Sequence, residues 1–362
     1  MKIQSCLLEK NSWSITMDFI EDLEKMARSL LKTKGYSDED LSNYAGNLLL
    51  VYFKNEQLTI IPKPRQVMYS KQFKCPEGYE KALKEFIEKV NTGKDLSKFM
   101  STKSRWIKRN FNDDLLNDWG IYHFHLTRRF HEDGTAKRSK YQLFACCDDN
   151  TVYLVQIYPH DMKNVYSQKE LLLIVKDNWS HLLYFLDDGK LSEQISDETR
   201  ASLRSNHCMT LTEIDDKIYF PRGGGYASDG SSINAVRKHN LYLNQVHILE
   251  RVFKDKNIEI MEYIQSKLGM ELNRHWTLKL LKTNAYSFTI IELINLIVMH
   301  LNLSGNSLQI TETKSINPFS RNNYSTTNFF NDNSKLKGIT AYMSNNGINI
   351  NFTEDKTIER PL

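Results

Sequence analysis

Two histidines alternate with an aromatic residue in the stretch GIYHFHLTRRF, and two arginines follow them directly. Side chains alternate between the two faces of a β-strand, so His123 and His125 should share one face. Tyr122, Phe124 and Leu126 should then share the other, buried face. The histidine face could look into a cleft, into a metal site or only into water.

Histidines beside arginines and lysines supply what metal-free RNA cleavage requires. One group takes the proton of the 2′-hydroxyl, another protonates the leaving 5′-oxygen, and cations hold the phosphate as its charge grows. Histidine titrates near neutrality and can fill either proton-transfer role. The candidate catalytic residues are His123, His125, Arg128, Arg138 and His160. The candidate RNA-binding residues are Arg129, Lys137, Lys140 and Tyr166.

Most of the chain's excess of basic over acidic residues lies in the region of these candidates. The whole protein has a formal charge of only +4, whereas residues 100–140 contain nine Lys or Arg against five Asp or Glu. Aromatic side chains that can stack on unpaired bases alternate with these cations. They are Trp106, Tyr122, Phe130 and Tyr141. We therefore expect RNA as a partner, bound by a local basic surface.

Two other interpretations use the same histidines. His123 and His125 could act with His160 as metal ligands, with Asp161 as the nearby carboxylate. A divalent ion would be repelled by so many cations, so we expect no metal ion and no other cofactor. The simplest alternative is a solvated basic strand face with half-buried histidines.

The remaining motifs give weaker signals. The five cysteines lack the spacing of a zinc site, and we expect small buried side chains in a reducing cytoplasm. The glycine-rich stretch at 220–232 lacks the pattern of a phosphate-binding loop and is interpreted as a flexible interdomain loop with a serine helix cap. No signal peptide is recognised, and the apolar stretch 288–301 is too short for a membrane span.

The hydrophobic periodicity predicts an α+β protein with a central antiparallel sheet. Three strands in a meander are expected at 119–130, 141–147 and 151–160. Helices are expected at 17–46, at 77–91, in the first half of 167–186 and at 232–266, with two short strands at 47–64. Ser37 should cap a helix together with Asp40. Near the C-terminus, an Asn-Gly signal predicts a hairpin. Residues 312–335 are predicted to form a long exposed loop.

These elements suggest a multidomain organisation. The expected segments are an N-terminal α+β domain at 1–95, a nuclease-type domain at 96–190, a glycine-rich linker with a long helix at 191–270, and a C-terminal α+β domain at 271–362. The apolar stripe of the 232–266 helix is expected to face a core, with a homodimer seam as the alternative.

One segment resembles a known family. The stretch KRSKYQLFACCDDNTVYLVQIYPHDMKNVYSQKEL is similar to the closing strands of RelE- and HigB-type toxin ribonucleases. In that family a basic residue precedes a Tyr-Arg-Leu strand, and an acidic turn leads to a Val-Tyr-Leu strand that ends in a histidine, with a tyrosine soon after. The preceding LLNDWGIYHFHL resembles the histidine strand of phage-associated nuclease-like members of the wider barnase–EndoU–colicin–RelE superfamily.

The resemblance covers residues 115–185 and implies a RelE-like fold with metal-independent ribonuclease activity of a toxin or phage-defence type. It also implies RNA and an inhibitory or phage-derived protein as partners. Gln142 stands where the family usually has arginine, so Arg138 or Lys140 would have to replace it, or the strand histidines would carry the catalysis. The alternative is a non-catalytic RNA- or protein-binding module on a degenerate nuclease fold.

Overall fold

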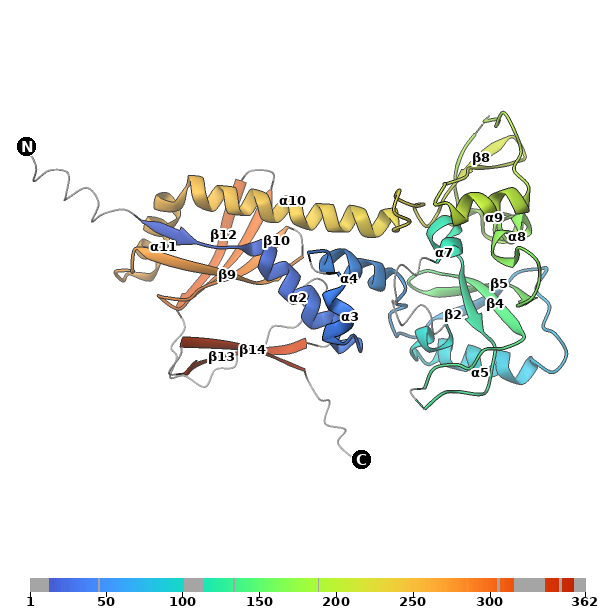
Figure 1. The fold of residues 1–362 in the computed structure, drawn as a ribbon, viewed down its shortest axis with the longest axis horizontal. Helices are drawn as coiled ribbons and strands as arrows, with labels where there is room; N and C mark the ends of the chain where they lie inside the picture. The colour runs from blue at the N-terminus through green and yellow to red at the C-terminus, as the bar shows by residue number, and fades with distance from the viewer. Residues whose placement is uncertain are drawn as a thin grey trace, which may run out of the picture. The chain divides into compact units, whose positions relative to one another are not determined.

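The computed structural model divides the chain into two compact units. Unit 1 consists of Met1–Leu49 with His239–Leu362, and unit 2 is Leu50–Lys238. The structure describes residues 13–315, apart from 45, 101–112, 133, 188, 285 and 305–306, and the backbone of 336–344 and 347–354. Both units combine helices with sheets, which confirms the predicted α+β class (Figure 1).

A four-stranded sheet forms the centre of unit 2. Its order is β2-β5-β4-β3, and the antiparallel β3–β4 and β4–β5 pairs confirm the predicted meander. Strand β2 pairs parallel to β5, a contact between distant segments that local periodicity could not predict. The strands are β2 (Gln66–Tyr69), β3 (Tyr122–His125), β4 (Tyr141–Cys147) and β5 (Thr151–Pro159).

Strand β3 is shorter than the predicted strand at 119–130. Helix α7 (Asp114–Trp119) occupies the beginning of that range, and Gly120 ends the helix in a left-handed conformation with φ 67°. A glycine adopts this conformation at little cost. The chain can therefore reverse from helix to strand within three residues.

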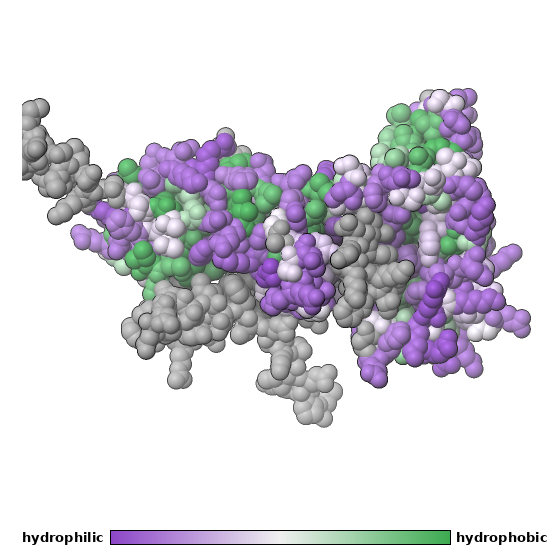
Figure 2. Space-filling view, viewed as in Figure 1, coloured by the Kyte–Doolittle hydropathy of each residue, from purple (hydrophilic) through white to green (hydrophobic). Residues whose placement is uncertain are grey.

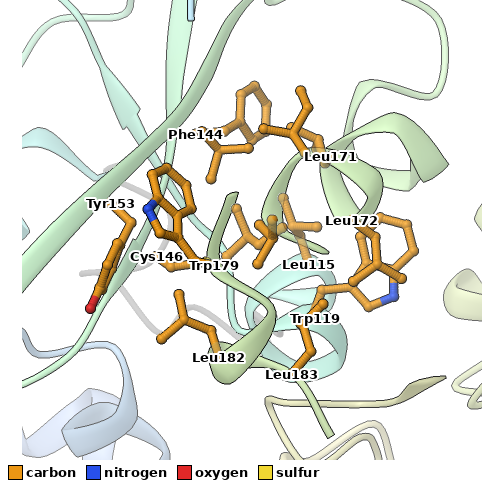
Figure 3. Close-up of a cluster of buried hydrophobic side chains, with 14 of the residues drawn as sticks. Leu115, Trp119, Phe144, Cys146, Tyr153, Leu171, Leu172, Trp179, Leu182 and Leu183 are labelled. Carbon is orange, nitrogen blue, oxygen red and sulfur yellow. The ribbon is translucent and has the colours of Figure 1, made fainter. Parts of the chain in front are cut away.

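Helices cover both faces of this sheet. Helix α5 (Glu80–Asn91) and the 3-10 helix η2 (Leu96–Phe99) pack on the face that contains Phe124 and Leu143. Helix α5 matches the helix predicted at 77–91. The other face packs on α7, α8 (Lys169–Trp179) and the 3-10 helices η3 (Val165–Ser167) and η4 (Ser180–Leu182). Figure 3 shows this second core, in which Phe144 and Trp119 lie among leucines (Figure 3).

The rest of unit 2 is a small three-stranded sheet with order β6-β8-β7 and helix α9 (Asp197–Ser205). The strands are β6 (Tyr184–Leu186), β7 (Thr212–Ile214) and β8 (Lys217–Phe220). Tyr184, Leu186 and Phe220 are exposed on it, and Figure 2 shows apolar side chains gathered around β8 (Figure 2).

The glycine-rich stretch after β8 is packed against α7, which is a different role from that of an interdomain loop. The backbone N–H of Gly223 donates to Asp118 O, and that of Gly225 donates to Asn117 O, each at 2.8 Å. A Cβ at position 223 would lie 2.0 Å from Leu116 O. Only glycine allows this close approach, so the loop satisfies carbonyl groups near the end of α7.

Unit 1 begins with β1 (Ser14–Thr16), α2 (Phe19–Thr33) and α3 (Asp38–Ser42). The predicted cap at Ser37 is confirmed, because its side chain and that of Asp40 form a complete capping box. The two strands predicted at 47–64 are wrong. Helix α4 (Leu48–Gln57) occurs there, because a short continuous apolar run fits a buried helix as well as a strand.

The main sheet of unit 1 has the order β1-β9-β10-β11-β12. Its strands after β1 are β9 (His275–Thr283), β10 (Ser287–Glu292), β11 (Ile297–Ser304) and β12 (Ser307–Ser315). The predicted C-terminal hairpin is confirmed by the antiparallel pair β13 (Leu336–Ser344) and β14 (Gly347–Glu354). Of the loop predicted at 312–335, the first four residues belong to β12 and the others lie outside the described residues.

The helix predicted at 232–266 is two helices, α10 (Ile233–Asp255) and α11 (Asn257–Leu268). Its apolar stripe is buried inside unit 1, and Phe253 packs edge-on against Phe19 with ring centroids 6.3 Å apart. The stripe is thus a core surface and not an open homodimer seam. None of the described helices has the length and apolar character that crossing a membrane requires.

A buried ion pair fixes α9 against α7. Arg204 donates from Nε and Nη2 to Asp118 Oδ2 at 3.0 and 2.6 Å, and from Nη1 to Tyr166 O. The guanidinium carbons of Arg200 and Arg204 lie 5.2 and 4.3 Å from the ring centre of Trp119. Nε and Nη1 of Arg200 have no hydrogen-bond partner among the described residues, and the charges of Asp118 and Asp197 both act on this buried guanidinium.

Replacing Asp118 by asparagine should therefore destabilise unit 2 strongly. Removal of one partner from a buried ion pair costs about 3–5 kcal/mol, because the other charge stays buried. Urea unfolding of the full chain should show this loss. Glu198→Gln is the matched control on α9, since Glu198 pairs with Lys163 at the surface and should change the unfolding free energy by less than about 1 kcal/mol. Equal effects of the two variants would contradict the prediction.

Candidate active site

Three histidines from two strands meet at one end of the unit 2 sheet. His123 and His125 are on β3, and His160 directly follows β5. The rings of His125 and His160 are parallel, with an interplanar angle of 1° and centroids 5.9 Å apart. His123 and His125 are only 8% and 6% exposed, so the histidine face of the strand is covered and does not open broadly to water.

The strand register explains this convergence. His123 lies opposite Phe144, and His125 lies opposite Gln142, at the start of β4. The N–H of His160 donates to Lys140 O at 2.7 Å, which holds the end of β5 beside the same start of β4. His123 and His125 on the edge strand β3 therefore lie near His160, which follows β5 on the other side of β4. Phe124 faces the opposite core with Leu126 and Tyr122, as the alternation predicted.

The contact with Arg138 determines which nitrogen of the His160 ring holds the proton. One of its Nη2 hydrogens points to His160 Nδ1, and the two nitrogens are 3.0 Å apart. A guanidinium can only donate, so Nδ1 must accept and the ring proton must lie on Nε2. Burial lowers the pKa of His160, and the charge of Arg138 lowers it further. His160 is therefore a neutral imidazole in this arrangement.

Tyr166 joins the cluster from η3. Its ring centre is 5.0 Å from that of His123, and its hydroxyl donates to Gln142 Oε1 at 2.8 Å. Burial raises the pKa of the Tyr166 hydroxyl, which keeps it protonated at neutral pH. Gln142 is thus an acceptor for tyrosine at the centre of the cluster.

Asp113 is a member of the site that the sequence did not reveal. Its Oδ2 lies 3.3 Å from His123 Nδ1, and its Oδ1 accepts the N–H of Leu116 as the N-cap of α7. The signal that could have identified it is the Asp-Asp pair before an apolar Leu-Leu step, a typical helix start. Predicting a single strand from 119 concealed the preceding helix and with it the reversal that brings Asp113 to His123.

The other predicted residues lie apart from the histidines or at the surface. Arg128 is exposed and donates from Nε to Glu85 Oε1 of α5 at 2.5 Å, and α5 covers the opposite face of the sheet. The structure therefore does not bring Arg128 to the catalytic candidates. Arg129, Lys137 and Lys140 are exposed in and around the β3–β4 connection, and Lys140 Nζ is 5.8 Å from the centre of the Tyr141 ring.

The metal hypothesis receives no geometric support from the described part of the chain. No group of three or more His, Cys, Asp or Glu side chains among those residues is arranged to hold a metal ion. Cys146 is buried and Cys147 is half-buried in β4, and burial raises the pKa of the Cys146 thiol to about 11. This thiol is therefore protonated and unsuited to nucleophilic attack.

Comparison of the chain with protein-family models, with curated proteins and with solved structures gave no match.

The burial of His125 predicts that the stability of the fold depends on pH. Desolvation lowers its pKa from 6.5 to about 4, and the nearby His123, His160 and Arg138 add to the effect. Between these pH values the unfolded chain binds a proton that the folded chain does not. The unfolding free energy should therefore fall by about 2 kcal/mol between pH 7 and pH 5 from this group alone.

Urea unfolding at a series of pH values measures this dependence. Below pH 6.5, His125→Gln should remove this contribution to the slope of unfolding free energy against pH. His131→Gln, at an exposed position of the following loop, should leave the slope unchanged. If His125→Gln has the same slope as the natural chain, His125 is not held neutral by the fold.

Proposed function

We propose that unit 2 is a metal-independent endoribonuclease of the toxin or phage-defence type. One observation carries the proposal: three imidazoles, a guanidinium and a tyrosine hydroxyl converge from β3, the β3–β4 connection, the end of β5 and η3. These are the groups that transfer of a phosphodiester to its own 2′-oxygen needs. The resemblance to RelE- and HigB-type ribonucleases supports the same reaction.

The reaction would divide its two proton transfers between His123 and His160. His123 takes the proton of the 2′-hydroxyl, since the Asp113 carboxylate beside it would stabilise the resulting imidazolium. The 2′-oxygen bonds to phosphorus, the bond from phosphorus to the 5′-oxygen breaks, and the 5′-oxygen receives a proton from His160. The products are a 2′,3′-cyclic phosphate and a 5′-hydroxyl.

Arg138 would couple substrate binding to the protonation state of His160. A phosphate that draws the guanidinium away from Nδ1 frees this nitrogen to take up a proton, and the phosphate charge favours the protonated ring. Arg138 would then hold the phosphate as charge develops. His125 remains neutral and stacks on His160. The exposed Arg129, Lys137 and Lys140 would contact the RNA backbone.

A non-catalytic RNA- or protein-binding module is the second candidate. It is favoured by Gln142, which replaces the expected arginine and is almost fully buried beneath Tyr166, and by the burial of the two strand histidines. In this case the basic loop binds RNA or a protein partner while the cluster serves only stability. Expression in bacteria distinguishes the two, since only the nuclease should be toxic and lose its toxicity in His123→Ala.

Purified protein should cleave total RNA in the presence of a chelator and leave 2′,3′-cyclic phosphate ends. Replacing either His123 or His160 by alanine should lower turnover by about 100-fold or more, while RNA affinity stays within a few-fold, because a general acid or base acts in the transition state. His131→Ala is the control at an exposed histidine. Cleavage that stops in chelator would contradict the metal-independent reaction, and unchanged turnover in both variants would leave the binding module as the better explanation.

RNA affinity should depend steeply on salt. Each phosphate contact to single-stranded RNA contributes about −0.7 to the slope of log affinity against log salt concentration. Charge reversal at both Arg138 and Lys140 should therefore reduce the slope by about 1.4 or more. Lys81→Glu with Lys84→Glu on α5 is the matched control, because these exposed lysines lie on the helix that covers the opposite sheet face. An equal change in both double variants would mean that the basic loop is not the RNA surface.

A further inference from the structure

The two carboxylate oxygens of Asp113 face different partners. Oδ1 accepts the N–H of Leu116 at 3.0 Å and caps α7, and Oδ2 lies 3.3 Å from His123 Nδ1. Asp113 is 5% exposed, and the imidazole of His123 is nearly as deeply buried. Both the aspartate and the histidine are therefore removed from bulk water.

Local chain geometry brings these side chains together. The six residues of α7 rise by about 9 Å, and the chain then reverses at Gly120. Three residues of extended chain after Gly120, up to His123, return by about 10 Å. The first turn of the helix and the second residue of β3 consequently lie side by side, with the N-cap carboxylate next to the imidazole.

Within the described part of the chain, neither of the two facing atoms has a hydrogen bond to any other group. Oδ2 of Asp113 and Nδ1 of His123 are both buried and find no other partner among the residues that the structure describes. A buried carboxylate oxygen without a donor costs about 1–3 kcal/mol or more. A proton on Nδ1 that points to Oδ2 satisfies both atoms, and a small rotation of the ring would shorten the 3.3 Å contact to a normal hydrogen bond.

We propose that Asp113 is a positioning residue that holds His123 in the tautomer protonated on Nδ1, so that Nε2 is the proton acceptor. This rests on the proposed ribonuclease function, in which His123 takes the 2′-hydroxyl proton. Asp113 itself does not contact the substrate. Its cap on α7 fixes the carboxylate, and the carboxylate fixes the ring and the nitrogen that reacts.

Asp113→Asn is the decisive variant. Asparagine caps helices as well as aspartate does, so its oxygen stays on the N–H of Leu116 and the helix should be preserved. Its NH₂ group then faces His123 and can only donate. Nδ1 must become the acceptor, and the proton should move to Nε2.

Two measurements on the full-length chain test the proposal. The ¹⁵N chemical shifts of the His123 ring identify the tautomer at neutral pH, and they should show Nδ1–H in the natural chain and Nε2–H in Asp113→Asn. Cleavage of a mixed-sequence single-stranded oligoribonucleotide should fall by about 100-fold or more in kcat, with binding within a few-fold. Asp18→Asn, at the cap of α2 where Asp18 accepts from Glu21 N, is the control and should change neither reading.

The outcomes separate this proposal from the proposed function. If the natural chain has His123 protonated on Nε2, or if Asp113→Asn keeps the Nδ1–H tautomer, the positioning role is overturned whatever the activity. A tautomer switch with unchanged kcat overturns it as well. If the natural chain cleaves no RNA but the tautomer switches as expected, the ribonuclease function fails, whereas the assignment of Asp113 as the residue that sets the His123 tautomer stands.

Discussion

The candidate site depends on the fixed position of the short helix α7. Six residues of helix have almost no stability of their own, so tertiary contacts must hold α7 in place. Asp118 near its end receives two hydrogen bonds from the buried Arg204, and carbonyl groups of the same turn accept N–H groups of the glycine-rich loop. These contacts anchor one end of the helix, and the other end presents Asp113 to His123.

The same contacts connect the two parts of unit 2. Arg204 belongs to α9 and also donates to the carbonyl oxygen of Tyr166, whose side chain lies in the histidine cluster. The small sheet and α9 are therefore structurally coupled to the central sheet. It supplies the cations that balance Asp118 and fixes the backbone from which Tyr166 reaches Gln142.

Burial gives the three histidines unequal properties although they lie close together. His125 is the most constrained, because desolvation and neighbouring positive groups act on its pKa in the same direction. His160 is more accessible, and its pKa is lowered by burial and by a guanidinium that a phosphate could draw away. Of the three, only His123 has a carboxylate at hydrogen-bonding range among the residues that the structure describes. This asymmetry is what a reaction with distinct acid and base roles requires, and residue type alone does not contain it.

The sequence by itself determined the elements whose signals are local. Short apolar runs in YQLFACC and TVYLVQIYP, with an Asp-Asp-Asn turn between them, define β4 and β5, and the Ser37 cap defines the start of α3. It also placed His123, His125, His160, Arg138 and Tyr166 in one candidate set. Strands of a meander must lie side by side, so these groups could be expected near one another.

Only the tertiary structure decided the rest, because distant segments had to meet. Strand β2 joins β5, so a boundary near residue 95 would divide one sheet, and unit 1 combines the two ends of the chain instead of forming separate terminal domains. The apolar run at 48–53 is helical, because its burial in the fold and not its periodicity determines its conformation. The chain reversal at Gly120 brings Asp113 to His123. The packing of α5 brings Glu85 to Arg128. Local spacing marks Asp113 as a helix start, but it does not show which partner either side chain meets.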